Sequence, residues 1–81
     1  MTHHLKTLPE YFKMSWAGWK TFEIRENDRN FEVGDEIELE EYSTESRYRA
    51  RTIKGTITYV TNYKQQNNYV VFSYKENGRF A

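Results

Sequence analysis

Short runs in which apolar and polar residues alternate most constrain what this chain can fold into. In residues 36–40, two aliphatic side chains alternate with three glutamates, so one face of a strand is apolar and the other is charged. Residues 21–25 alternate in the same way. Residues 47–61 and 69–74 are rich in Thr, Ile, Val and Tyr, which strands favour. With a short strand near residues 3–6, these runs predict about five strands.

One segment has a helical period instead. Leu8, Phe12 and Trp16 recur every four residues and form an apolar stripe on one side of a helix. A sequence of the capping-box type begins at Thr7, where the hydroxyl can accept a hydrogen bond from the backbone of the first turn. We therefore predict a helix over residues 8–17.

The length and composition are those of one small domain of the α+β class, mainly β, spanning residues 1–81. Gly55 predicts a bend in the longest strand, and one early helix among about five strands indicates a small closed or nearly closed barrel. Aromatic residues make up 17% of the chain, so we expect rings to fill much of the core. Residues 76–81 are expected to fray.

Composition also excludes several classes of function. The chain has no cysteine, so it has neither disulfides nor a thiolate metal site, and no run of 18 apolar residues occurs. We expect a cytoplasmic monomer without a cofactor. The net charge is zero, which excludes a globally basic nucleic-acid binder. Residues 1–46 nevertheless carry five basic and eleven acidic side chains, and residues 47–81 carry seven and one, so a basic face is possible.

His3 and His4 are the chain's two histidines. Adjacent residues on a strand point to opposite faces, so the pair is a poor chelate, and the sequence predicts no metal site.

A basic row follows the strand at residues 36–40. Arg47, Arg49 and Arg51 share one face of a strand and could track phosphates. If residues 43–46 form the loop of a hairpin, however, Glu40 faces Arg49 and Glu38 faces Arg51, and such pairs stabilise a ladder by roughly 0.2–1 kcal/mol each. We favour this cross-strand pairing.

Six tyrosines could stack on bases, but a small barrel uses most of its rings as core. They are Tyr42, Tyr48, Tyr59, Tyr63, Tyr69 and Tyr74. We expect core positions for all except Tyr63, which lies in a polar loop and is a candidate contact.

The strand at residues 21–25 carries a further candidate site. Phe22 and Ile24 are expected to face inward, and Lys20 shares their parity, so it is expected at the inner rim. Glu23 and Arg25 then form an ion pair on the outer face. An ideal strand cannot bring Lys20 and Glu23 together unless it begins after Lys20 or is bulged there.

The same segment resembles a known signature. Gly18-x-Lys20-x-x-Glu23-x-Arg25 matches the Gly-x-Lys-x-x-Glu-x-Arg pattern of ASCH domains, a branch of the PUA-like superfamily. A wider match looks like one small family of unknown function in bacteria and phages. It comprises His3-x-Leu5-Lys6, Pro9-Glu10-Tyr11-Phe12, Thr21-Phe22-Glu23-Ile24-Arg25, Asn27-Asp28-Arg29 and Val33-Gly34-Asp35.

The resemblance implies a PUA-like β-barrel of about five or six strands with a helix beside a cleft. It also implies binding of RNA or of a modified nucleotide or nucleoside. The cleft residues it implies are Lys20, Glu23 and Arg25, with His3, Lys6, Asp28 and Arg29 from the narrower family. Trp19 or Tyr63 could add a stacking face.

Two other functions remain open. One ASCH relative is an amidohydrolase acting on an acylated cytidine, with a lysine and a threonine three residues later. Here Lys20 is present, but Glu23 occupies the threonine position. A small amidohydrolase acting on acylated nucleosides, with Lys20 as its catalytic residue, is the first alternative. A non-catalytic protein-interaction domain is the second.

Overall fold

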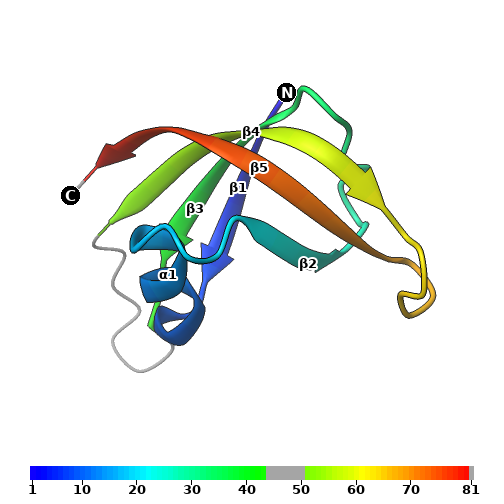
Figure 1. The fold of residues 1–81 in the computed structure, drawn as a ribbon, viewed down its shortest axis with the longest axis horizontal. Coiled ribbons are helices and arrows are strands. Elements are labelled where there is room, and N and C mark those ends of the chain that lie inside the picture. The colour runs from blue at the N-terminus through cyan, green and yellow to red at the C-terminus, as the bar shows by residue number, and fades with distance from the viewer. Residues whose placement is uncertain (44–50, 81) are drawn as a thin grey trace.

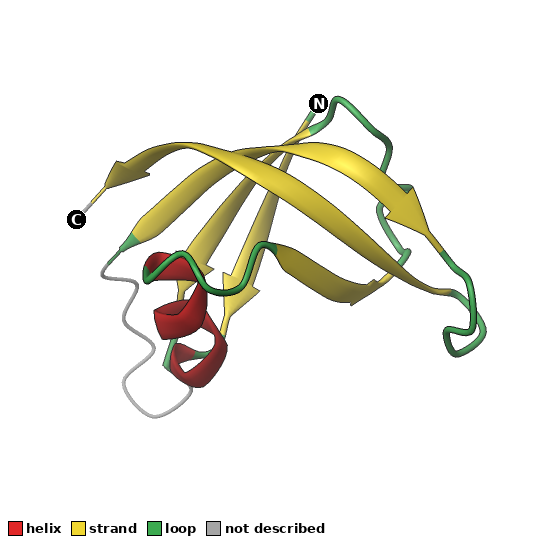
Figure 2. Cartoon of the chain, viewed as in Figure 1, coloured by secondary structure: helices red, strands yellow, loops and turns green. Residues whose placement is uncertain are grey.

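The computed structural model describes residues 1–43 and 51–80. Within these residues there are one helix and one five-stranded sheet, and Figures 1 and 2 show the curvature of the sheet. The elements in chain order are β1 (Thr2–Thr7), α1 (Pro9–Trp16), β2 (Phe22–Glu26), β3 (Glu36–Glu41), β4 (Thr52–Thr61) and β5 (Tyr69–Phe80). The predicted class, mainly β with one helix, is confirmed. Within the described residues, no helix is long and apolar enough to cross a membrane.

The sheet has the strand order β1-β3-β4-β5-β2, with β1 parallel to β3 and the other pairs antiparallel. It curls into a half-barrel, so the closed form is not reached: β1 and β2 remain edge strands. The chain passes from β1 through α1 to β2, so the helix lies where the two edges approach each other. Gly55 lies at a register shift between β4 and β5, which confirms the predicted bend.

The core lies on the inner face of the sheet, under α1. Its members are Leu5, Phe12, Phe31, Ile37, Leu39, Ile53, Ile57, Val70, Phe72 and Tyr74. Four of these ten are aromatic and Trp16 packs against the cluster, so rings fill much of the core as expected, although six members are aliphatic. Of the six tyrosines considered, Tyr74 is buried, Tyr59 is 62% exposed and Tyr63 is 72% exposed. Tyr48 lies outside the described residues.

Helix α1 begins one residue later than predicted and without the capping box. Its N-cap is Leu8, which makes no side-chain cap. Thr7 is instead the buried last residue of β1, and its hydroxyl donates to the carbonyl oxygen of Leu5. At the other end, Gly18 has φ +87°, and the Trp19 amide donates to the Met14 carbonyl oxygen, as in a Schellman motif.

Strand β2 buries the opposite face from the one predicted. Glu23 is 4% exposed and points inward, whereas Phe22 is 43% exposed and Ile24 is 55% exposed. The strand begins at Phe22, so Lys20 precedes it and does not follow the alternation of side chains along the strand. Lys20 can therefore reach Glu23. The predicted inner position of Phe22 and Ile24, with Glu23 on the outer surface, is therefore wrong.

The register of β3 and β4 also differs from the prediction. Glu38 faces Lys54 and Glu40 faces Thr52, because ten residues rather than four separate the two strands. Arg51 lies before β4 and pairs with Glu41 through two bonds, Nε–Oε1 at 2.9 Å and Nη2–Oε2 at 3.0 Å. This guanidinium lowers the pKa of the Glu41 carboxyl. The predicted positions of Arg47 and Arg49 lie outside the described residues.

The last strand is longer than expected. Strand β5 continues to Phe80, and Glu76 and residues 78–80 pair with β4, so the predicted fraying is wrong for these residues. Arg79 donates from Nη2 to the carbonyl oxygen of Trp16, and its guanidinium carbon lies 4.3 Å from that ring's centroid. These contacts fix the end of β5 against the helix.

Candidate functional site

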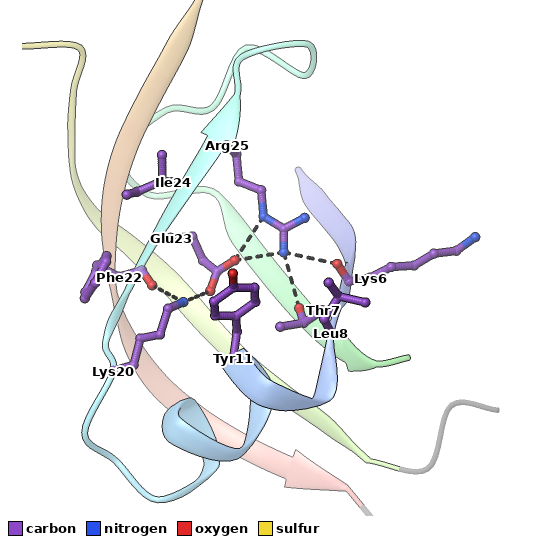
Figure 3. Close-up of a pocket in the computed structure, with 9 residues that line it drawn as sticks. All are labelled: Lys6, Thr7, Leu8, Tyr11, Lys20, Phe22, Glu23, Ile24 and Arg25. Carbon is purple, nitrogen blue, oxygen red and sulfur yellow. Dashed lines mark hydrogen bonds and ion pairs between the residues drawn. The ribbon is translucent and has the colours of Figure 1, made fainter. Parts of the chain in front are cut away.

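A cleft of about 480 Å³ opens where α1 meets the two edge strands. Figure 3 shows its lining, which comes from the end of β1, the start of α1, the segment before β2 and β2 itself. The lining residues are Lys6, Thr7, Leu8, Tyr11, Lys20, Phe22, Glu23, Ile24 and Arg25. This volume lies in the usual range for small-ligand sites, roughly 300–1,000 Å³.

Arginine side chains bridge the gap between the two edge strands. Arg25 of β2 donates from Nη2 to the Lys6 carbonyl oxygen at 3.2 Å and to Thr7 Oγ1 at 3.3 Å. Arg29 donates from Nη1 to the His4 carbonyl oxygen at 2.5 Å. Both carbonyl groups belong to the edge of β1 that does not pair with β3. The guanidinium groups therefore satisfy backbone acceptors that a neighbouring strand would otherwise cover.

Glu23 is a buried carboxylate held between two cations. Its Oε2 lies 2.5 Å from Lys20 Nζ, and its Oε1 accepts from Arg25 Nε at 2.9 Å. A buried charge is tolerated when it is paired and hydrogen-bonded, and here both carboxylate oxygens are engaged. This explains why Glu23 can occupy an inner position that an apolar residue would usually take.

The backbone of Lys20 is fixed from two sides. Its amide donates to the Met14 carbonyl oxygen at the end of α1, and its own carbonyl oxygen accepts from the Tyr74 hydroxyl at 3.1 Å. Burial raises the pKa of the Tyr74 phenol, so this hydroxyl remains protonated and donates at neutral pH. The ammonium group also donates to the Phe22 carbonyl oxygen at 2.8 Å.

The cleft presents hydrogen-bond donors more than acceptors. Lys20 has three N–H groups, of which Glu23 and the Phe22 carbonyl take two. Within the described residues, the bonds of Arg25 use Nε and Nη2, which leaves Nη1 open. Two cationic side chains, Lys20 and Arg25, and the carboxylate of Glu23 are directed into the cleft, which gives a net charge of +1. The arrangement suits ligand phosphate, carboxylate or carbonyl oxygens.

Tyr11 supplies an aromatic wall to the cleft. The side chain projects from α1 toward Glu23 in Figure 3, and the residue is 51% exposed. Lys20 Nζ lies 6.0 Å from its ring centroid. A planar ligand could stack on this ring within reach of the two cations.

The structure brings together only part of the predicted site. Lys6, Lys20, Glu23 and Arg25 line the cleft, as the resemblance implied. The side chain of Lys6 turns outward in Figure 3, and its Nζ lies 5.0 Å from the ring centroid of Tyr42.

His3 does not line the cleft. It is 4% exposed, its Nε2 lies 2.8 Å from Asp35 Oδ2, and its ring packs edge-on against Phe31 at 4.8 Å. This hydrogen bond lowers the pKa of the Asp35 carboxyl. The contacts tie β1 to the start of β3, which is a structural role.

The other four predicted residues also lie outside the cleft lining. Trp19 is 80% exposed just after α1, and Tyr63 is exposed in the loop before β5. Asp28 and Arg29 occupy the turn after β2, with 3.9 Å between Arg29 Nε and Asp28 Oδ1. Only Arg29 reaches β1, through the bond to its backbone.

Sequence reasoning missed Thr7, Leu8, Tyr11, Phe22 and Ile24 as cleft residues. The spacing of Leu8 and Tyr11 was an available signal, because residues three apart share a helix face. Nothing in the local sequence placed Thr7 next to Arg25, since 18 residues separate them.

Comparison with known proteins identifies a family. A family model described as Domain of unknown function (DUF3850) matches residues 2–74, which is 73 of the 81 residues. No curated protein matches the chain.

Proposed function

The chain belongs to the family Domain of unknown function (DUF3850), and from its cleft we propose that it is a binding module for RNA or for a modified nucleotide. The observation that carries the proposal is the pair of cations held by Glu23 beside an aromatic wall. A phosphate or carbonyl oxygen of the ligand meets Lys20 and Arg25, and the base stacks on Tyr11.

This assignment changes the role of Glu23. A carboxylate could accept a hydrogen bond from a base amino group, but both oxygens of Glu23 already accept from Lys20 and Arg25. Glu23 therefore acts as a positioning residue that aims the two cations. The direct contacts to the ligand come from donors.

The size of the cleft limits what enters it. About 480 Å³ accommodates one nucleotide but not a duplex, so RNA would present an unpaired residue. The resemblance of residues 18–25 to the ASCH signature supports the same class of ligand. We propose on that basis that the chain is an ASCH-type domain.

Calorimetric titration tests the proposal. The probes are the four ribonucleoside 5′-monophosphates, N4-acetylcytidine and a short single-stranded RNA. We expect saturable 1:1 binding of at least one mononucleotide, and its loss in Lys20→Met. Lys13→Met, which removes an exposed lysine on α1, is the matched control. Absence of binding for every probe would contradict the proposal.

The salt dependence gives a second criterion. Two phosphate-contacting cations predict a slope of about −1.4 in a plot of log affinity against log salt concentration for a single strand. A slope near zero would exclude contact with phosphate and would mean that Lys20 and Arg25 bind carbonyl oxygens of the ligand instead.

The same titration separates the alternatives. Release of acetate from N4-acetylcytidine, abolished in Lys20→Ala, would identify an amidohydrolase. The structure gives little support to a hydroxyl nucleophile, because Thr7 Oγ1 donates to the Leu5 carbonyl and lies 3.3 Å from Arg25 Nη2. If Lys20→Ala lowers stability, and neither the wild type nor any variant binds a probe, a protein-interaction domain is favoured.

A further inference from the structure

A histidine and two glutamates converge on the outer face of the sheet, away from the core. His4 lies on β1, and Glu38 and Glu40 lie on β3. His4 Nδ1 is 3.5 Å from Glu38 Oε1 and 3.2 Å from Glu40 Oε2. One donor atom from each residue lies within 4.8 Å of the others.

The parallel pairing of β1 with β3 creates this convergence. His4 is directly opposite Glu38, and Glu40 is two residues further along the same face. Both carboxylate side chains are largely covered, with 23% and 17% exposure, while the imidazole is 59% exposed. The backbone ladder on both strands therefore holds the three donors in place, with an open side toward solvent.

Lys54 faces Glu38 in the ladder but is directed away from it. Its Nζ lies 5.6 Å from the ring centroid of Phe80, and no ion pair joins Lys54 to Glu38 among the described residues. The Glu38 carboxylate is directed at His4 instead, with Oε1 3.5 Å from Nδ1.

We propose that His4, Glu38 and Glu40 bind a divalent transition-metal ion of the zinc class. One imidazole nitrogen and two carboxylate oxygens are ligands that Zn²⁺ accepts, and three protein ligands leave a position for water. The sequence predicted no metal because His3 and His4 point to opposite faces. That geometry holds, but the neighbouring strand supplies the partners that His3 cannot.

Zinc titration of the full chain tests the site. We expect one Zn²⁺ per chain by calorimetry, with the affinity lowered at least ~10-fold in His4→Ala and in Glu38→Gln. Glu36→Gln is the matched control, because Glu36 lies on the same face of β3 opposite Thr2 and outside the cluster. The control should keep the wild-type affinity.

Histidine NMR locates the ion directly, since the chain has only two histidines. Zn²⁺ should shift the ring resonances of His4 and leave those of buried His3 in place. Binding that His4→Ala leaves unchanged, a shift of His3 instead, or no saturable binding would each overturn the proposal. In the last case the cluster is a hydrogen-bonded group in which His4 contacts the two carboxylates.

Discussion

Strands β2 and β3 share an alternating pattern but bury opposite kinds of residue. In β3, Ile37 and Leu39 are fully buried, and the glutamates face outward. In β2, Glu23 is buried, and Phe22 and Ile24 are exposed. The two strands belong to the same sheet, so the difference comes from their neighbours.

Position in the sheet explains the contrast. Strand β3 lies between β1 and β4 and contacts α1, so its inner face is covered by core. Among the described residues, strand β2 pairs only with β5, and its inner face borders the cleft. An inward carboxylate is tolerated there because two cations neutralise it. We infer that β3 contributes mainly to stability and β2 mainly to ligand binding.

The largest effect is expected in β3. Leu39→Ala opens a cavity at a fully buried position, so the free energy of unfolding should fall by about 2–5 kcal/mol. Chemical denaturation measures the change. A loss below about 0.5 kcal/mol, the range of ordinary surface substitutions, would contradict the central position of β3 in the core.

A smaller loss of stability is expected from Glu23→Ala in β2. Removing the carboxylate leaves Lys20 and Arg25 without their shared partner, at a cost of about 1–3 kcal/mol. Nucleotide affinity should fall as well, because the cations are no longer aimed into the cleft. Glu10→Ala, at an exposed position of α1, is the control for a lost carboxylate. Unchanged stability and unchanged affinity together would refute the role assigned to Glu23.

Arg25→Lys separates charge from geometry within β2. Lysine keeps the positive charge but not the planar fork that reaches Glu23, Lys6 and Thr7 together. We expect stability to fall by about 0.5–1.5 kcal/mol. Amide hydrogen exchange should accelerate in β1, whose edge Arg25 covers. Equal exchange rates in both proteins would show that this bridge does not hold the edge strands together.

Acid should weaken the contact at the start of β3. The hydrogen bond from His3 lowers the pKa of Asp35 below its usual 3.8. The stabilisation is therefore complete above the unfolded-state pKa and is lost as pH falls through the folded-state pKa. As the pH falls from about 5 to about 3, the melting temperature should decline less for Asp35→Asn than for the wild type. The melting temperature of Asp28→Asn, a substitution in an exposed turn, should decline as much as that of the wild type.

The smallest effect is expected at the exposed face of β2. Ile24→Thr keeps a β-branched side chain and should change stability by less than about 0.5 kcal/mol. Denaturation under the conditions used for Leu39→Ala gives a direct comparison. If the two losses were similar, β2 would bury its apolar face and the contrast with β3 would fail.

The local sequence predicted the positions of the helix and strands better than it predicted which residues pair and which faces are buried. The strand at residues 36–40 and the helix following Leu8 appeared from periodicity alone. Alternation defines two faces of a strand but not which is buried, and for β2 that depends on Phe72 and Val71 of β5, far along the chain. The error at Glu23 therefore arose where a non-local ion pair replaced core packing.

The site was predicted only in its local part. Lys20, Glu23 and Arg25 lie close in sequence, so one signature indicated all three. Thr7 and Tyr11 join them only after α1 folds back beside β2. The register of β3 and β4 was missed for a similar reason, because it depends on the length of the connection rather than on the residues that pair.

Amide NMR of the ¹⁵N-labelled chain, titrated with ribonucleoside 5′-monophosphates, tests the central claim most directly. If Glu23 of β2 faces inward to form a ligand site, the chemical-shift changes should cluster at Thr7, Tyr11 and residues 20–25. The amide resonance of Tyr63 should not shift. Shifts confined to the loop around Tyr63, or none at millimolar ligand, would contradict the claim. The buried carboxylate of β2 would then serve the fold alone.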